Sequence, residues 1–140
     1  MIWNTQIKLL PGGHFAIVNI TERVRDFVKS TEIKNGQVLV FYRHTTGAVF
    51  IGEHEPGIIA DLEEMMERIA PVNHAYHHHL RNVDFNGQAH VRTALMTINV
   101  TIPIFDGEMM LGTYQEILVF DDQTDPATRY VAVQVTGELS

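Results

Sequence analysis

Residues 56–70 have the strongest helical period in this chain, and any fold must accommodate that helix. Apolar side chains recur at the 3.6-residue period, at Ile58, Ile59, Leu62, Met65, Met66 and Ile69. Pro56 lies near the start, where proline is tolerated, and Pro71 cannot continue a helix. The pattern predicts that the longest helix of the chain runs from about Gly57 to Ile69.

The segments on both sides of this helix are typical of strands. They are rich in β-branched and aromatic residues and lie at 2–9, 15–19, 37–42, 48–51, 97–105, 109–120 and 129–137. Pro11-Gly12-Gly13 separates the first two, which are therefore expected to pair as an antiparallel hairpin. Asp106-Gly107 predicts a second hairpin between residues 97–105 and 109–120.

Two further helices and two connecting segments complete the pattern. Residues 21–30 and 88–96 have helical spacing, with Thr21 as the expected N-cap of the first. Asn35-Gly36 predicts a turn, and residues 72–87 have no period and read as a polar loop. The order of elements predicts an α+β fold: a single domain over residues 1–140, with a largely antiparallel sheet and helices packed on one face.

Composition limits the classes of function. The 140 residues are 45% hydrophobic and 19% charged, which supports a folded core and argues against a disordered chain. The net charge of −7 disfavours nucleic acid and anionic membranes as partners. The first ten residues do not resemble a signal peptide and no apolar run is long enough to span a membrane, so we expect a cytoplasmic protein. The absence of cysteine agrees with a reducing compartment.

Eight histidines are the compositional oddity. A single histidine is more often a surface or packing residue than a ligand, but three of these have positions from which they could converge. His44 follows a strand, His78 lies in the polar loop, and His90 is near the start of a helix. Zinc would accept three imidazoles and a water, whereas Mg²⁺ would prefer carboxylates such as Glu53 and Asp84 together with phosphate oxygens. The residues leave both divalent metals, zinc and magnesium, open.

Other features point to an anionic ligand. Helix N-termini near Gly57 and Gly87 offer backbone amides that attract phosphate, and four arginines are candidate reinforcements: Arg43, Arg81, Arg92 and Arg129. Gly112 interrupts an apolar strand, as glycine does at a bulge or beside a ligand. The motifs of serine hydrolases, P-loop NTPases and dinucleotide oxidoreductases are absent, so a histidine-centred small-molecule site is the remaining interpretation.

Several blocks along nearly the whole chain resemble one known family. They are His44-Thr45-Thr46-Gly47, Glu53, Asp61, Tyr76 followed by His78, Asn86 followed by Ala89-His90, Gly107, Leu111 to Gln115, and the closing strand from Val133 to Glu138. In their order and spacing the chain resembles the YjbQ-like family, also called secondary thiamine-phosphate synthase enzymes. It departs from the family pattern at Tyr114, where Trp is usual, at Gln88, where His or Pro is common, and at Gly52, where Asn often precedes the Glu.

The resemblance implies an α+β homotrimer with a pocket lined by the motif histidines. It also implies the joining of hydroxymethylpyrimidine pyrophosphate to thiazole phosphate with loss of pyrophosphate, and hence a small phosphorylated heterocyclic substrate. The alternative is a non-catalytic trimer that binds a metal ion or a phosphometabolite. The expected catalytic or substrate-facing residues are His44, His90, Glu53, Asn86 and Gln115, and the expected metal ligands are His44, His78 and His90.

Overall fold

The computed structural model describes residues 1–81 and 85–140. In chain order the elements are β1 (Ile2–Leu9), β2 (Ala16–Asn19), α1 (Thr21–Ser30), β3 (Asn35–Tyr42), β4 (Gly47–Gly52), α2 (Pro56–Ile69), the 3-10 helix η1 (His77–Leu80), α3 (Gly87–Ala94), β5 (Asn99–Phe105), β6 (Glu108–Met109), β7 (Glu116–Asp121) and β8 (Arg129–Glu138). No helix in the described ranges is long and apolar enough to cross a membrane.

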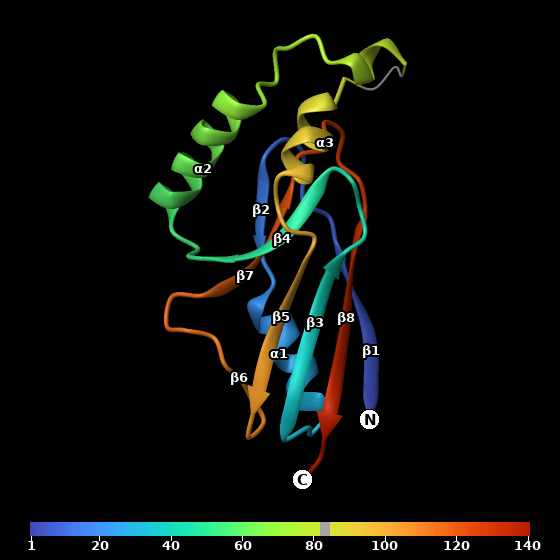
Figure 1. Cartoon of the computed structure of the whole chain (residues 1–140), viewed down its shortest axis with the longest axis vertical. Helices are drawn as coiled ribbons and strands as arrows, with labels where there is room; N and C mark the ends of the chain where they lie inside the picture. The colour runs from blue at the N-terminus through green and yellow to red at the C-terminus, as the bar shows by residue number, and fades with distance from the viewer. Residues whose placement is uncertain (82–84) are drawn as a thin grey trace.

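The strands form two antiparallel sheets. The larger has the order β1-β8-β3-β5-β6, and the smaller has the order β2-β7-β4. In Figure 1 the long strands of the larger sheet lie side by side, with both chain ends at its lower end. β8 is paired on both sides, with β1 and with β3. The α+β class with antiparallel pairing is confirmed.

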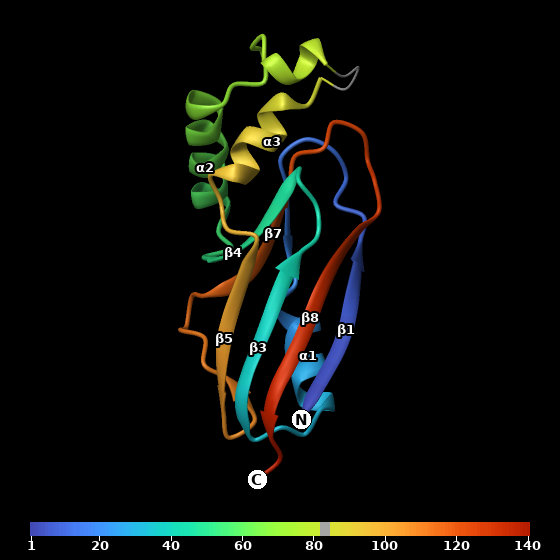
Figure 2. The same cartoon turned by 45° about the vertical axis from the view of Figure 1, so that its right-hand side comes forward.

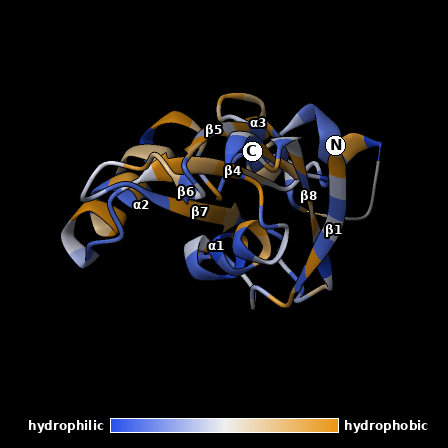
Figure 3. Ribbon diagram, turned by 90° about the horizontal axis from the view of Figure 1, so that it is seen from below, coloured by the Kyte–Doolittle hydropathy of each residue, from blue (hydrophilic) through white to orange (hydrophobic). Residues whose placement is uncertain are grey.

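The main core lies between the larger sheet and α1. Alternate residues of β3 and β8 share one face, so that Val38, Val40 and Val133 are buried together. Val24 and Val28, one helical turn apart, bring α1 into the same cluster. Figure 2 shows α1 behind β3 and β8, and Figure 3 shows blue and orange ribbon on α1, as expected for an amphipathic helix.

α2 and α3 occupy the upper end of the molecule, beyond the long strands (Figure 2). α2 has 14 residues and is the longest helix of the described chain, as its period predicts. Its half-buried Leu62 and Met66 pack against a small cluster centred on Phe120 of β7. Only this side of α2 is covered, since none of its residues is fully buried.

The structure corrects the predicted hairpin between the first two strands. β1 pairs with β8 and β2 pairs with β7, so the turn at residues 11–15 carries the chain from one sheet to the other. Phe15 in this segment has a positive φ of 50°. In a tight two-residue hairpin turn, a residue with positive φ is usually glycine or asparagine. Local turn residues predicted the reversal correctly but not the partner, which is chosen by burial of the strand faces.

Three local predictions are also wrong. Asn35-Gly36 lies within β3, opposite Glu138 and Gly137. A Cβ on Gly36 would lie 2.0 Å from the Thr136 carbonyl oxygen, so no larger residue fits there. The close approach of two strands, rather than a turn, requires glycine there. The predicted strand 109–120 is split into β6 and β7. Thr21 is the first helical residue of α1 instead of its N-cap, and its N–H donates to the Asn19 side chain.

Candidate functional site

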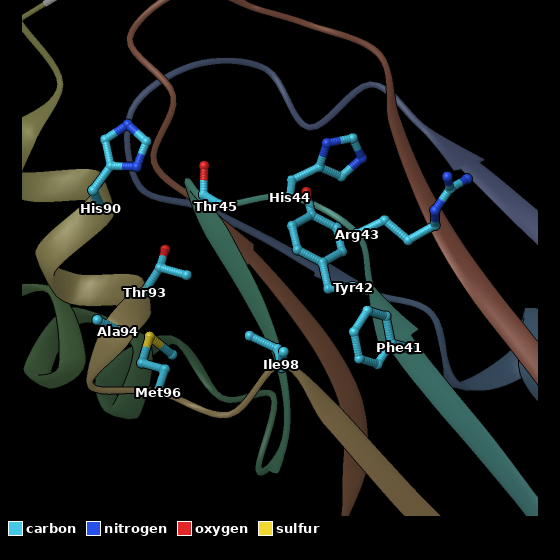
Figure 4. Close-up of a pocket in the computed structure, with 10 residues that line it drawn as sticks. All are labelled: Phe41, Tyr42, Arg43, His44, Thr45, His90, Thr93, Ala94, Met96 and Ile98. Atoms are coloured by element: carbon cyan, nitrogen blue, oxygen red, sulfur yellow. The ribbon is translucent and has the colours of Figure 1, made fainter.

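A pocket of about 820 Å³ lies where β3 ends beside α3. It is lined by Phe41, Tyr42, Arg43, His44, Thr45, His90, Thr93, Ala94, Met96 and Ile98 (Figure 4). The Tyr42 N–H donates to the Ile98 carbonyl at 2.8 Å, which joins the end of β3 to the segment that follows α3. The pocket therefore combines aromatic and aliphatic walls with two imidazoles and two threonine side chains.

His44 faces β8 with both ring nitrogens. Its Nε2 accepts from the Tyr130 backbone N–H at 2.9 Å, and its Nδ1 is 3.4 Å from Arg129 Nη1. A neutral imidazole has one accepting nitrogen, and the shorter contact, from the Tyr130 N–H, assigns that role to Nε2; the Nδ1 proton then faces Arg129 Nη1, and these two donors share no hydrogen bond. Burial, and then the Arg129 charge, lower the pKa of His44 below its usual value. His44 is therefore a neutral ring held against β8.

A buried carboxylate lies behind this ring. Asp121 Oδ2 accepts from the Tyr42 hydroxyl at 2.5 Å and from Arg129 Nε at 3.0 Å. Burial, and then the hydrogen bond to Asp121, raise the pKa of Tyr42 far above its usual value, so Tyr42 stays a hydroxyl donor. The end of β3, the end of β7 and the start of β8 are tied together at this point.

His78 and His90 form the close histidine pair of the site. Their ring centroids are 4.7 Å apart, although one comes from η1 and the other from α3. The neighbouring His79 accepts the Gly87 N–H at 3.0 Å with its Nε2, and this contact fixes η1 against the start of α3. In Figure 4 the His44 ring extends away from His90. His44 and His90 of one chain thus line the same pocket, but their rings do not point toward each other.

The described residues of one chain do not fit a three-ligand metal centre. Within residues 1–81 and 85–140, no three His, Asp or Glu side chains are grouped to hold a metal ion. His78 and His90 supply two imidazoles, while the Nε2 of His44 is engaged with Tyr130. Asp84, named as a possible Mg²⁺ ligand, lies outside the described residues. Convergence of the three histidines remains a prediction for an assembled protein.

Glu53 and Gln115 lie at the other end of the smaller sheet. β4 runs from Gly47, beside the His44 loop, to Gly52, which pairs with Glu116. At about 3.3 Å per residue, this strand separates Glu53 from the His44 loop by roughly 17 Å or more. Glu53 is exposed, and Gln115 Oε1 accepts the Gly112 N–H at 2.7 Å. Neither residue lines the pocket of its own chain.

Asn86 lies immediately before α3 and contributes a buried polar group near the histidine pair. Its Nδ2 donates to Gln123 Oε1 at 3.1 Å, whereas its Oδ1 is buried and has no hydrogen-bond partner among residues 1–81 and 85–140. Gln88 Oε1 and Thr93 Oγ1, also on α3, are in the same situation. Buried acceptors without partners are rare and mark places where water or a ligand can bind.

Two of the expected phosphate contacts are already satisfied within the protein. Arg92 is completely buried and bonds Asp122 at 2.9 Å, Glu67 at 2.8 Å and the Ala70 carbonyl at 2.9 Å. The amides at the start of α2 are capped by the Glu55 carboxylate, whose pKa these hydrogen bonds lower. The predictions that Arg92 and the N-terminus of α2 bind phosphate are therefore wrong.

Sequence reasoning also missed some residues. Thr93, Met96 and Ile98 line the pocket, but in the sequence they look like ordinary helix and strand residues. Asp121 and Asp122 could have been noticed, because two carboxylates directly follow the apolar run 117–120. A pair of acidic residues at the end of a buried strand indicates buried cationic partners.

Known sequences and structures resemble this chain over nearly its whole length. A UPF0047 protein of Archaeoglobus fulgidus is 38% identical over 129 residues, covering 92% of this chain and 98% of the relative. A UPF0047 protein of Methanothermobacter thermautotrophicus is 34% identical over 137 residues, covering 98% and 94%.

The fold is shared with solved structures. A YbjQ-like protein of unknown function from Sulfolobus solfataricus superposes with a TM-score of 0.93 at 27% identity, covering 99% of both chains. A hypothetical protein from Aeropyrum pernix superposes with a TM-score of 0.90 at 26% identity, covering 97% of this chain and 99% of the other. Residues 5–138 match the family described as UPF0047 protein YjbQ-like. The chain belongs to the YjbQ-like UPF0047 family.

Proposed function

We propose that this protein binds a small phosphorylated heterocycle in the pocket between β3 and α3. We further propose that it joins hydroxymethylpyrimidine pyrophosphate to thiazole phosphate. The observation that carries the proposal is the lining of the pocket. Phe41, Met96 and Ile98 offer apolar surface to a flat ring, while His90 offers a polar group beside it.

The proposed reaction is a substitution at the pyrimidine methylene. The thiazole nitrogen forms a bond to this carbon as the carbon–oxygen bond to pyrophosphate breaks, and pyrophosphate leaves with the electron pair. The protein would hold the two reactants in line and donate hydrogen bonds to the leaving group. We assign this donation to His90, because both nitrogens of His44 face β8.

We also propose that the working form is a cytoplasmic homotrimer. Phe41, Val91, Leu95 and Ile98 are exposed apolar residues in or next to the pocket, and a neighbouring protomer would cover them. The ends of β4 and β7 carry Glu53 and Gln115, which are too far from the pocket of their own chain to contribute to it. In the trimer they would reach the pocket of a neighbour. Light scattering at the monomer mass would remove this part of the proposal.

A non-catalytic role is the second candidate. No carboxylate lines the pocket in the described part of the chain, and His44 is held neutral. Acid–base groups are therefore few, as expected of a trimer that holds a metal ion or a phosphometabolite without turnover.

A turnover assay with both thiamine precursors separates the two candidates. The protein is prepared from a strain that lacks its own thiamine-phosphate synthase, and is assayed with and without Mg²⁺ or Zn²⁺. His90→Ala is expected to lose turnover while remaining folded, and exposed His77→Ala is the matched control that keeps it. Equal turnover in parent and His90→Ala would reject the catalytic proposal. Binding of either precursor without product would favour the binding protein.

A further inference from the structure

We infer that Arg129 is the positioning residue of this pocket. It ties the loop of residues 43–46 to β8 and to the buried Asp121, and thereby fixes the His44 wall in one orientation. The inference rests on the proposed function, because it concerns how the same pocket is kept ready for a ligand. Arg129 itself does not line the pocket, so it acts through its hydrogen bond to Thr46 on the loop that carries His44.

The guanidinium of Arg129 reaches a different partner with each of its nitrogens. Nε bonds Asp121 Oδ2 at 3.0 Å, Nη2 donates to Thr46 Oγ1 at 2.9 Å, and Nη1 is 3.4 Å from His44 Nδ1. The Arg129 side chain is only 13% exposed. Two of these contacts are hydrogen bonds, to Asp121 and to Thr46, and a planar, rigid fork holds both acceptors at fixed angles, which a lysine ammonium on a flexible stem cannot do.

Asp121 gives this arrangement a fixed base. Its side chain is 3% exposed, and Oδ1 accepts the Gln123 N–H at 2.9 Å. Oδ2 accepts from both Tyr42 and Arg129. A carboxylate with this many donors has few alternative positions, so the guanidinium bonded to it is also held in place.

The His44 ring is confined by groups from several elements. The Tyr130 N–H from β8 donates to Nε2, the Tyr42 ring from β3 packs edge-on with centroids 5.2 Å apart, and Arg129 lies beside Nδ1. Asp121 behind Arg129 and Arg43 on the same loop are the other charged groups whose fields act on the ring. The His44 imidazole is therefore neutral and faces the pocket in one orientation. Its ring provides a surface against which a flat heterocycle can pack.

Three variants test this role. In Arg129→Gln the cation and the fork are removed, in Arg129→Lys the charge is kept without the fork, and Arg25→Gln removes an arginine from an ion pair on α1. The measurement is the ¹⁵N spectrum of the His44 imidazole in the unliganded protein at pH 7.5. The parent and Arg25→Gln are expected to show one tautomer, with Nε2 unprotonated. Both Arg129 variants are expected to show averaged nitrogen signals and about tenfold weaker binding of hydroxymethylpyrimidine pyrophosphate, the loss typical when a supporting residue is removed.

Two results would overturn the inference. Parent-like His44 signals in Arg129→Gln would mean that the Tyr130 amide positions the ring alone, and parent-like signals in Arg129→Lys would mean that charge suffices. The double variant Asp121→Asn/Arg129→Gln removes both buried charges and provides a folded sample if Arg129→Gln alone is unstable. The spectrum requires no substrate, so failure of the thiamine-phosphate assay would leave this result intact.

Discussion

The rings of His78 and His90 lie with their centroids 4.7 Å apart, across the junction between η1 and α3. The two imidazoles come from separate elements that lie against each other. The contact between His79 and the Gly87 amide joins these elements. The pair is the part of the expected three-histidine site that one chain assembles.

Removal of either ring should lower metal binding if the assembled protein holds a metal at this pair. We expect His78→Ala and His90→Ala to have a lower ratio of zinc to protein by elemental analysis, because each loses a nitrogen ligand. Exposed His77→Ala should keep the parent ratio. Unchanged metal content in the first two variants would place His78 and His90 in substrate contact or catalysis instead.

Loss of the buried guanidinium of Arg92 should strongly destabilise the fold. Arg92→Leu leaves the fully buried Asp122 with the His14 ring as its ionisable partner in place of a permanent cation, and breaking a buried pair in this way costs about 3–5 kcal/mol. Urea denaturation should show this loss in the free energy of unfolding. Arg68→Leu, which breaks an exposed pair with Glu64, should cost about 1 kcal/mol or less. Equal losses would contradict the assignment of Arg92 as the link between α2, α3 and β7.

Stability should fall as the solution is acidified, in part through His44. The pKa of His44 is lower in the folded protein than its ordinary value of 6.5, so the unfolded chain takes up this proton more readily. The stabilisation is complete above pH 6.5 and is lost as the pH falls through that value towards the folded-state pKa. Urea midpoints at pH 7.5 and 5.5 should therefore differ less in His44→Gln than in the parent. A variant of exposed His74 should retain the parental difference, and identical differences in all three proteins would refute this role.

Two glycines of β4 should respond differently to alanine. A Cβ on Gly47 would lie 2.3 Å from the Phe120 carbonyl oxygen and 2.8 Å from Asp121 Oδ2, neither of which can move freely. Gly47→Ala should therefore cost about 1–3 kcal/mol in unfolding free energy, the usual range for overpacking. At Gly52 the nearest atom is on the Phe50 ring at 3.1 Å, and this side chain can adjust. Thermal melts should show a much smaller change for Gly52→Ala, and the opposite order would contradict the packing described.

Local pattern predicts the elements of this protein better than their partners. The period of residues 56–70 specifies α2, because spacing and helix boundaries are local properties. The pairing of β1 with β8 joins the two ends of the chain, and no local signal encodes it. Gly36 was interpreted as a turn residue for the same reason, since the backbone that crowds it is that of Thr136.

In the candidate site, too, the positions of residues along the chain are predictable from local sequence, whereas their long-range contacts are not. The positions of His44 and His90 at the ends of elements predict that they face a site, and both line one pocket. The direction of the His44 ring could not be predicted, because it is decided by Arg129 and Tyr130, far along the sequence. Glu53 and Gln115 were identified through resemblance to a family, and a family pattern does not say which chain of an assembly each residue serves.

The central place of β8 in the larger sheet also constrains how the protein is made. β1 pairs with β8, residues 129–138, so this pairing cannot form until the ribosome has synthesised that distant segment. Until then β1 and one edge of β3 expose unpaired backbone groups and apolar side chains, the features that chaperones bind and that aggregation exploits. A chain truncated before residue 129 would lack the strand that joins β1 to β3, and we expect it to remain dependent on chaperones.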